Sequence, residues 1–252
     1  PYTSTTTPKH GKFGFFKSEL DCFRMVATEL GLIEKSADVF ARHPLVYLME
    51  AADDICYQVM DIEDAHKLKI LGIEEVTTLL TGFFNTERCK HITGVLDNID
   101  DDNEKVAYLR SCVVGELVGE CAKVFVDNEE CILNGEFEGC LIDHISPVAR
   151  NGYAECSRTA WRKIYNSPDV VDIELAGNQI ITFLLDRLID AVLLPEKNYS
   201  RLLLSRIPHQ YDTSSPTTYG KIQSVLDHIS GMTDVYALDL FRKLNGLSLP
   251  AV

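Results

Sequence analysis

The chain has 252 residues, enough for one large helical domain or two smaller ones. Its net charge of −14 argues against a mainly electrostatic grip on nucleic acid, although a local basic cleft would still bind phosphate. No apolar run approaches the roughly 18 residues of a membrane-spanning helix, and the first residues do not resemble a signal peptide. Eight cysteines without a CxxC pair are typical of buried thiols in a reducing compartment, so we expect a cytoplasmic protein.

The N-terminal part of the sequence is typical of a loop. Residues 3–8 are rich in Ser, Thr and Pro, and residues 12–16 (KFGFF) show no helical period. The sequence SELD at 18–21 resembles a capping box and predicts a helix to about Leu30, with Gly31 as its end. Because the first ordered element follows a loop, we expect a further N-terminal part to precede this chain.

The next predicted helix, over 42–64 (RHPLVYLMEAADDICYQVMDIED), is the most informative element. His43-Pro44 marks its start, because proline suits the first helical turn. Eight apolar residues of this helix are expected to be buried: Leu48, Met49, Ala51, Ala52, Ile55, Cys56, Val59 and Met60. Asp53, Tyr57 and Asp61 recur every four residues and are expected to share one face.

The acidic residues of this helix have no local basic partner. Between Arg42 and Lys67 the sequence has six acids and no Lys or Arg. A carboxylate held against apolar packing is costly unless something pairs with it, so a metal ion or a distant cation is implied. The alternative is an acidic face that is simply solvated.

The rest of the chain is predicted to be helical. Further helices are expected over 73–80, from the acidic turn 97–104 through Val124, and over 148–165, 174–194 and 219–244. We interpret the acids of 97–104 as capping and solvation, since a helix start favours negative charge. Asn245-Gly246 should end the last helix. No strand pattern or internal repeat is apparent, so residues 1–252 are predicted to form a single all-α region.

Four stretches resemble a known family. The segment at 42–65 (RHPLVYLMEAADDICYQVMDIEDA) is similar to the signature helix of the deoxyguanosinetriphosphate triphosphohydrolase family, in the HD-domain superfamily. Residues 1–19, 161–181 and 226–246 resemble a loop, a later helix-turn-helix and the C-terminal helix of that family, in the same order. The resemblance implies that 1–80 is the end of an HD-type catalytic core and 81–252 a C-terminal helical part.

The resemblance also shows what this sequence lacks. Family members bind their metal through a histidine, a His-Asp pair and a later aspartate, but none of the seven histidines here is followed by aspartate. The resemblance therefore implies the C-terminal part of an HD triphosphohydrolase. The catalytic residues are then expected in the missing N-terminal part, and the isolated chain is expected to be inactive.

The resemblance assigns roles to five residues. Asp53 matches the last metal ligand, for Mg²⁺ or Mn²⁺ with another transition metal as the alternative, and Asp54 would orient a neighbouring group. Tyr57 would pack against the sugar, with core packing as its alternative role. Asp61 would accept a hydrogen bond from the 3′-hydroxyl, or be a solvated acid. Lys12 would face the triphosphate, or be an ordinary surface lysine.

The implied activity is hydrolysis of a deoxynucleoside triphosphate to deoxynucleoside and tripolyphosphate. The family also implies a homo-oligomer, commonly a hexamer. Two other functions stay open. An isoprenoid-synthase-like diphosphate enzyme would need a DDxxD motif, but after Asp53-Asp54 the final acid is replaced by Tyr57. The other alternative is a non-catalytic helical module for regulation or assembly.

Overall fold

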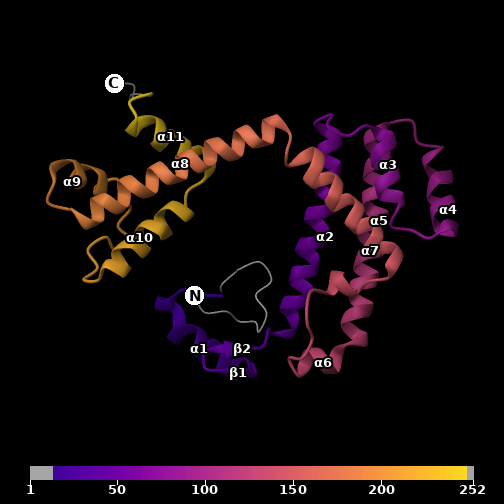
Figure 1. The fold of residues 1–252 in the computed structure, drawn as a ribbon, viewed down its shortest axis with the longest axis horizontal. Helices are drawn as coiled ribbons and strands as arrows, with labels where there is room; N and C mark the ends of the chain where they lie inside the picture. Colours follow the sequence, from indigo (N-terminus) through magenta and orange to yellow (C-terminus); the bar gives the residue numbers. More distant parts are fainter. Residues whose placement is uncertain (1–13, 249–252) are drawn as a thin grey trace. The chain divides into compact units, whose positions relative to one another are not determined.

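The computed structural model describes residues 14–248 and is all-α, as predicted, apart from one short hairpin (Figure 1). The chain divides into two compact units, Pro1–Tyr165 and Asn166–Val252. Each unit has its own hydrophobic core. The expected division near residue 80 concerns catalytic role rather than compactness, and it stays a prediction.

The first unit is built on two long helices. Helix α2 (Pro44–Lys67) packs along α5 (Asp102–Asp127), and α3 (Ile73–Thr81) and α7 (Pro147–Thr159) complete the core. The remaining elements are η2 (Lys17–Glu19), α1 (Leu20–Glu29), β1 (Glu34–Ser36), β2 (Val39–Phe40), α4 (Thr86–Leu96), α6 (Glu129–Leu133), η3 (Leu141–His144) and a π-helical turn, η4 (Ala160–Ile164). Of these, α4 and α6 were not predicted from the sequence.

The starts of the helices follow from their caps. The predicted start of α2 is confirmed, because the ring of His43 accepts a hydrogen bond from the Leu45 backbone nitrogen at 3.2 Å. Asp101 caps α5 by accepting from the Glu104 nitrogen at 3.0 Å, as expected for the acidic turn. The predicted capping box at 18–21 differs from the observed one, which lies at the start of η2, where the carboxylate of Glu19 accepts from the Phe16 nitrogen at 2.7 Å.

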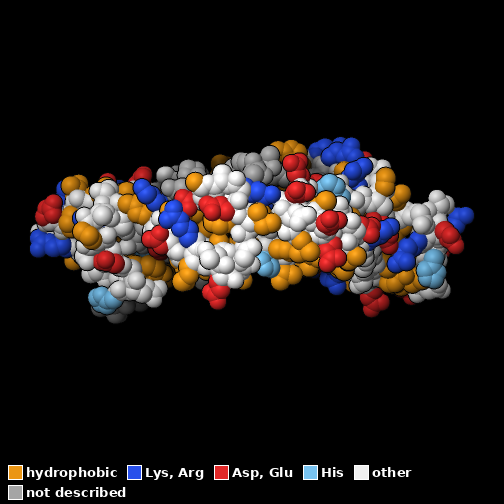
Figure 2. Space-filling view, turned by 90° about the horizontal axis from the view of Figure 1, so that it is seen from below, with side chains coloured by type: hydrophobic (Ala, Val, Ile, Leu, Met, Phe, Trp, Pro, Cys, Tyr) orange, Lys and Arg blue, Asp and Glu red, His pale blue; other side chains and the backbone are white. Residues whose placement is uncertain are grey.

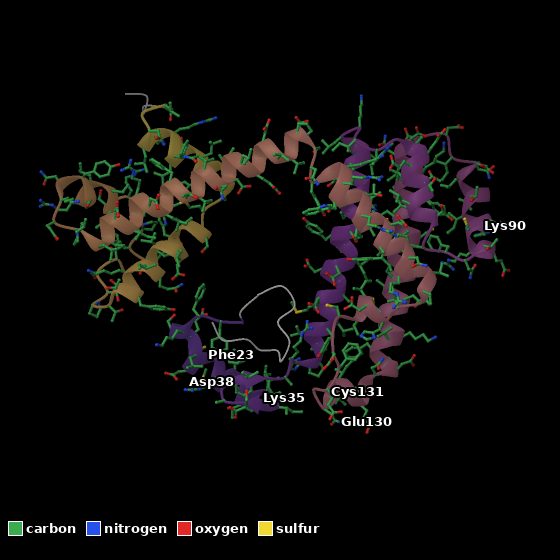
Figure 3. All side chains as sticks on the ribbon, in the orientation of Figure 1. Phe23, Lys35, Asp38, Lys90, Glu130 and Cys131 are labelled. Atoms are coloured by element: carbon green, nitrogen blue, oxygen red, sulfur yellow. The ribbon has the colours of Figure 1, made fainter. Side chains whose placement is uncertain are left out.

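The prediction of no strand was wrong for one short segment. Strands β1 and β2 pair antiparallel through a turn at Asp38, whose φ of 61° lies in the left-handed region. Asp38 also accepts a hydrogen bond from Arg24 of α1 at 2.6 Å. The rings of Phe23 and Phe40 meet edge to face, with their centroids 5.5 Å apart. Figure 3 labels Phe23 and Asp38 in this part of the chain. A strand this short leaves no alternating pattern to detect.

The hairpin fits closely against the loop that follows α6. Gly135 has a φ of 67°, and a β-carbon there would lie 2.6 Å from the β-carbon of Ala41, directly after β2. It would also meet the Lys35 side chain at 3.3 Å. Only glycine therefore fits this position without strain. Figure 3 labels Lys35 on the hairpin and Cys131 on α6, the helix before this loop.

The second unit packs three helices onto one long one. Helix α8 (Pro168–Leu193) contacts α9 (Asn198–Leu204), α10 (Thr218–Ser230) and α11 (Asp234–Leu244). The prediction of a single helix over 219–244 was wrong, because the helix ends at Ser230 and Thr233 caps a new one by accepting from Tyr236 at 3.2 Å. Helix α8 begins six residues earlier than predicted, and α9 was not predicted. Gly246, at φ 71°, confirms the predicted end.

The surface carries side chains of every type (Figure 2), and most of the cysteine thiols are at least partly exposed. On the face drawn in Figure 2, acidic and basic side chains are interspersed with hydrophobic ones. Within residues 14–248, no helix is long and apolar enough to cross a membrane. None of the eight cysteines, which all lie within residues 14–248, forms a disulfide, and only Cys121 and Cys156 are buried, so the expectation of buried thiols was wrong for the others. Burial raises the pKa of Cys121 to about 11 and that of Cys156 to about 12.

Candidate functional site

The structure gives basic partners to several acids of helix α2. Glu50 forms an ion pair with Arg42, which precedes the helix. Glu63 is buried and accepts a hydrogen bond from Arg110 of α5 at 2.7 Å, while Lys67 reaches its other oxygen at 2.9 Å. Of these cations only Arg110 is distant, and it fulfils the expectation of a distant cation for Glu63. The expectation that no local base pairs with the acids was wrong for Glu50 and Glu63, because Arg42 and Lys67 flank the helix and reach them.

The remaining acids of α2 differ in their partners. Asp64 is exposed and pairs with Lys67 at 3.3 Å. Asp61 is half-buried and accepts a hydrogen bond from the hydroxyl group of Tyr165. In contrast, Asp53 makes no ion pair or side-chain hydrogen bond with any residue between 14 and 248. Asp53 is therefore an acid of this helix that the described fold does not explain.

Asp53 lies on an exposed apolar face of α2, defined by Leu45, Val46, Leu48, Met49, Ala52, Cys56, Tyr57 and Met60. Met49 is 74% exposed and Tyr57 62% exposed. The expectation that Leu48, Met49, Ala52, Cys56 and Met60 are buried is wrong for this structure. The expectation is confirmed for Ala51, Ile55 and Val59, which together with Tyr47 and Ile62 form the stripe that α2 buries against the rest of the unit. The alternative role of Tyr57 in core packing is not what this structure shows.

A row of polar contacts joins α2 to α7. The hydroxyl of Tyr153 donates to the backbone carbonyl of Asp54 at 3.4 Å, and Ser157 donates to Oε1 of Gln58 at 2.5 Å. Gln58 is only 6% exposed, and its Nε2 has no partner in the described part of the chain. These contacts place the backbone of Asp54, next to Asp53, beside α7. The predicted orienting role of Asp54 itself stays a prediction.

The third contact of this row brings together Tyr57, Asp61 and Tyr165. Burial raises the pKa of Asp61, and the hydrogen bond from Tyr165 offsets only part of that rise. The pKa of Tyr165 is also raised, first by burial, then by Asp61, with a smaller effect of Tyr57. The three side chains therefore form one cluster at the junction of α2 and η4. The sequence alone does not point to Tyr165, because no spacing rule relates it to a residue 104 positions earlier.

The described residues do not form a complete metal site. No group of three or more His, Cys, Asp or Glu side chains able to hold a metal occurs within residues 14–248. Asp53, exposed and unpaired, fits the role of one oxygen ligand. A metal ion at Asp53 therefore needs further ligands from outside this range. Lys12, expected to face the triphosphate, lies outside the described residues.

Comparisons with known proteins found one matching family model and several homologues. A family model described as a phosphohydrolase-associated domain matches residues 144–243. A Synechocystis protein named deoxyguanosinetriphosphate triphosphohydrolase-like is 33% identical over 94% of this chain and 53% of its own length. A protein of the same name from Pseudomonas aeruginosa is 31% identical over 96% of this chain and 56% of its own length.

A further relative, from Yersinia enterocolitica, is named deoxyguanosinetriphosphate triphosphohydrolase. It is 26% identical over 92% of this chain and 54% of its own length. The chain is therefore homologous to the deoxyguanosinetriphosphate triphosphohydrolases over most of its length, and the resemblance found in the sequence is confirmed. It spans about half the length of these relatives.

Proposed function

We propose that this chain forms one part of the active site of a metal-dependent triphosphohydrolase. The reaction cleaves a deoxynucleoside triphosphate, such as dGTP, to the deoxynucleoside and tripolyphosphate. The names of the homologues support the class of substrate. The observation that carries the proposal is Asp53, an acid without a partner in the described structure, on the helix that resembles the family's signature.

In this proposal Asp53 supplies one oxygen ligand to a divalent ion, Mg²⁺ or Mn²⁺, or another transition metal if histidines complete the site. When bound, such an ion polarises a phosphoryl oxygen and lowers the pKa of a coordinated water. Asp54 contacts α7 through its backbone carbonyl, so the turn of α2 that carries Asp53 lies against that helix. The chain therefore positions a ligand rather than forming the whole site.

The exposed apolar face of α2 supports a contribution from outside the described residues. A face of eight largely apolar side chains is unfavourable in water and is covered in most folded proteins. We propose that the N-terminal part of the complete protein covers this face and brings the remaining ligands and the catalytic residues. Covering it would also exclude water from Asp53 and strengthen the electrostatic interactions there.

The sugar would lie beside the next turns of the same helix. Tyr57 is one turn from Asp53 and presents an exposed ring, so it can form a wall against C2′. Asp61, a further turn away, accepts the Tyr165 hydroxyl at Oδ2. We propose that its Oδ1 accepts the 3′-hydroxyl. Lys12 would contribute a cationic phosphate contact.

The test is a hydrolysis assay with Mg²⁺ or Mn²⁺, using dGTP and product analysis for deoxyguanosine and tripolyphosphate. The chain is assayed alone and after fusion to the corresponding N-terminal part of a longer relative. We expect no activity alone and metal-dependent activity in the fusion. Turnover by the chain alone would disprove the divided site. A folded fusion with no activity would favour a non-catalytic module, and release of diphosphate from a prenyl diphosphate would favour the isoprenoid-synthase alternative.

The family also leads us to propose a homo-oligomer, with a hexamer as the expected form. Sedimentation equilibrium of the fused protein measures this directly. A monomer at micromolar concentration would contradict it.

A further inference from the structure

After helix α7 the backbone hydrogen-bond pattern changes from α-helical to π-helical, just before Tyr165. The backbone nitrogen of Tyr165 donates to the carbonyl of Ala160 at 3.0 Å, which is an i to i+5 hydrogen bond. Residues Ala160–Ile164 accordingly form a π-helical turn, η4. Such a turn contains one residue more than an α-helical turn and shifts every later residue by one position.

Because of this shift, Tyr165 and not Ile164 faces α2 at the position of Asp61. Tyr153 and Ser157 contact α2 from α7, four residues apart. In an uninterrupted α-helix the same face would continue through positions 160 and 164, so that Ile164 would lie opposite Asp61. With one additional residue in the turn, Tyr165 takes that place, and its hydroxyl reaches the carboxylate. Ile164 is instead buried.

Packing holds the turn in this form. Ala160 and Ile164 are buried, at its two ends. Lys163 contacts both carboxylate oxygens of Glu75 on α3 at 2.7 Å. Arg162 is exposed. The turn is therefore held by its buried ends and by the ion pair with α3. Its exposed side, which includes Arg162, has room for the additional residue.

We propose that the π-helical turn brings the Tyr165 hydroxyl to the carboxylate of Asp61, and that Tyr165 is a positioning residue for recognition of the sugar 3′-hydroxyl. This inference rests on the proposed function. The Tyr165 hydroxyl donates to Oδ2 of Asp61, which fixes the carboxylate rotamer and directs Oδ1 away from Tyr165. Tyr165 acts through Asp61, and the π-helical turn acts through Tyr165. Neither needs to contact the reacting phosphate.

The first test uses the active fusion and the variant Tyr165→Phe, which removes only the hydroxyl group. The ratio of kcat/KM for dGTP to that for 2′,3′-dideoxy-GTP should fall by roughly five- to tenfold, because a hydrogen bond to a charged acceptor is lost. Tyr47→Phe is the matched control. It removes a tyrosine hydroxyl from α2 that donates to the Phe137 carbonyl at 3.0 Å, away from Asp61.

The pH profile separates positioning from simple destabilisation. The Tyr165 hydrogen bond lowers the pKa of Asp61, so its removal should shift the acidic limb of kcat/KM for dGTP to higher pH. Tyr47→Phe should leave that limb in place. An unchanged nucleotide ratio and an unchanged limb in Tyr165→Phe would overturn the positioning role. Absence of activity in the parental fusion would overturn the proposed function instead, and the second test would still decide the geometry.

The second test examines the π-helical turn in the 252-residue chain itself, by NMR titration of tyrosines labelled at Cζ. The Tyr165 signal, identified by its loss in Tyr165→Phe, should ionise at higher pH than an exposed tyrosine. Deletion of Arg162 should convert the turn to a regular α-helix and retain this behaviour. Insertion of one alanine after Arg162 should rotate Tyr165 by about 100° and abolish it.

Arg162→Ala is the length-matched control and should behave like the parent. Tyr153 precedes the turn, so its signal reports in every variant whether α7 is still folded. A late-ionising Tyr165 in the insertion variant, or its loss in a folded deletion variant, would overturn the register argument.

Discussion

Arg110 of α5 donates a hydrogen bond to Glu63 of α2 over 2.7 Å, and Glu63 is only 7% exposed. This contact joins the two long helices of the first unit through a charged pair. Burial alone would raise the pKa of Glu63, but the hydrogen bonds from Lys67 and Arg110 outweigh it and keep the pKa below its usual value. Glu63 therefore stabilises the fold in its ionised form.

Arg110→Met should lower the free energy of unfolding of the first unit by about 1–3 kcal/mol, because a buried carboxylate loses one partner while Lys67 remains. Arg88→Met, which removes an exposed pair with Glu116 at 3.4 Å, should cost less than about 1 kcal/mol. Urea denaturation at pH 7 measures both. Because the folded pKa of Glu63 is lowered, its contribution is present above the unfolded pKa of about 4.3 and is lost as the pH falls through the folded value. Equal costs for both variants would contradict this role of Glu63.

Gly152 of α7 packs closely against the turn at Gly82 and Phe83, directly after α3. A β-carbon at this position would lie 2.9 Å from the backbone nitrogen of Phe83 and 3.0 Å from the carbonyl carbon of Gly82. Gly152→Ala should therefore destabilise the first unit by about 1–3 kcal/mol through overpacking. Gly115→Ala, in helix α5 with open space around it, should instead stabilise by up to about 1 kcal/mol. Thermal denaturation of the two variants checks the opposite signs, and a stabilising Gly152→Ala would show that α7 does not contact this turn closely.

His228 should make the second unit sensitive to acid. The side chain is 4% exposed beside the ring of Tyr211, and burial lowers its pKa. His228 therefore binds a proton more readily in the unfolded chain than in the folded one. The free energy of unfolding should be highest above the unfolded pKa of about 6.5 and should decrease as the pH falls below it. Amide hydrogen exchange in α10 at pH 7.5 and pH 5.5 measures the effect. His228→Gln should reduce this pH dependence, whereas the exposed-site control His209→Gln should retain it. An equal reduction in both variants would exclude His228 as the cause.

The sequence predicted the helical class and several helix boundaries because those depend on local chemistry. His43, Asp101 and Gly246 act through caps and backbone geometry within a few residues of themselves. The break near Gly231 was missed because the apolar spacing continues across it into α11. A glycine within a helical pattern is compatible with an intact helix as well as with its end.

The candidate site was less predictable, since α2 is apolar on almost every side. Periodicity alone did not show that Ala51 and Ile55 are buried while Met49 and Met60 are exposed. The face that carries Asp53 depends on what covers it, and that information is not local. Tyr165 was missed for a related reason, because a π-helical turn breaks the 3.6-residue rule by which faces are assigned.

Asp53→Asn in the active fusion should lower kcat by roughly 100-fold or more, since the carboxylate is proposed to hold the metal ion that prepares the reaction. The fold should be unchanged, because Asp53 makes no ion pair within residues 14–248. Mn²⁺ titration followed by electron paramagnetic resonance measures the accompanying loss of affinity. Asp64→Asn on the same helix removes a charge that pairs with Lys67 and should keep near-parental activity. Parental metal affinity and rate in Asp53→Asn would show that this acid is only a surface residue.

Tyr57 provides the test of sugar discrimination at the 2′ position. Its ring is 62% exposed on the apolar face of α2, one helical turn beyond Asp53. If the metal at Asp53 lies near the α-phosphate, the sugar is next along the substrate, and an added 2′-hydroxyl would meet the ring. Tyr57→Ala in the active fusion should therefore raise the ratio of kcat/KM for GTP to that for dGTP by roughly tenfold. Tyr57→Phe keeps the ring and should retain the parental ratio. If the ratio is the same in Tyr57→Ala, the ring does not exclude the 2′-hydroxyl, and the sugar lies elsewhere than beside this turn of α2.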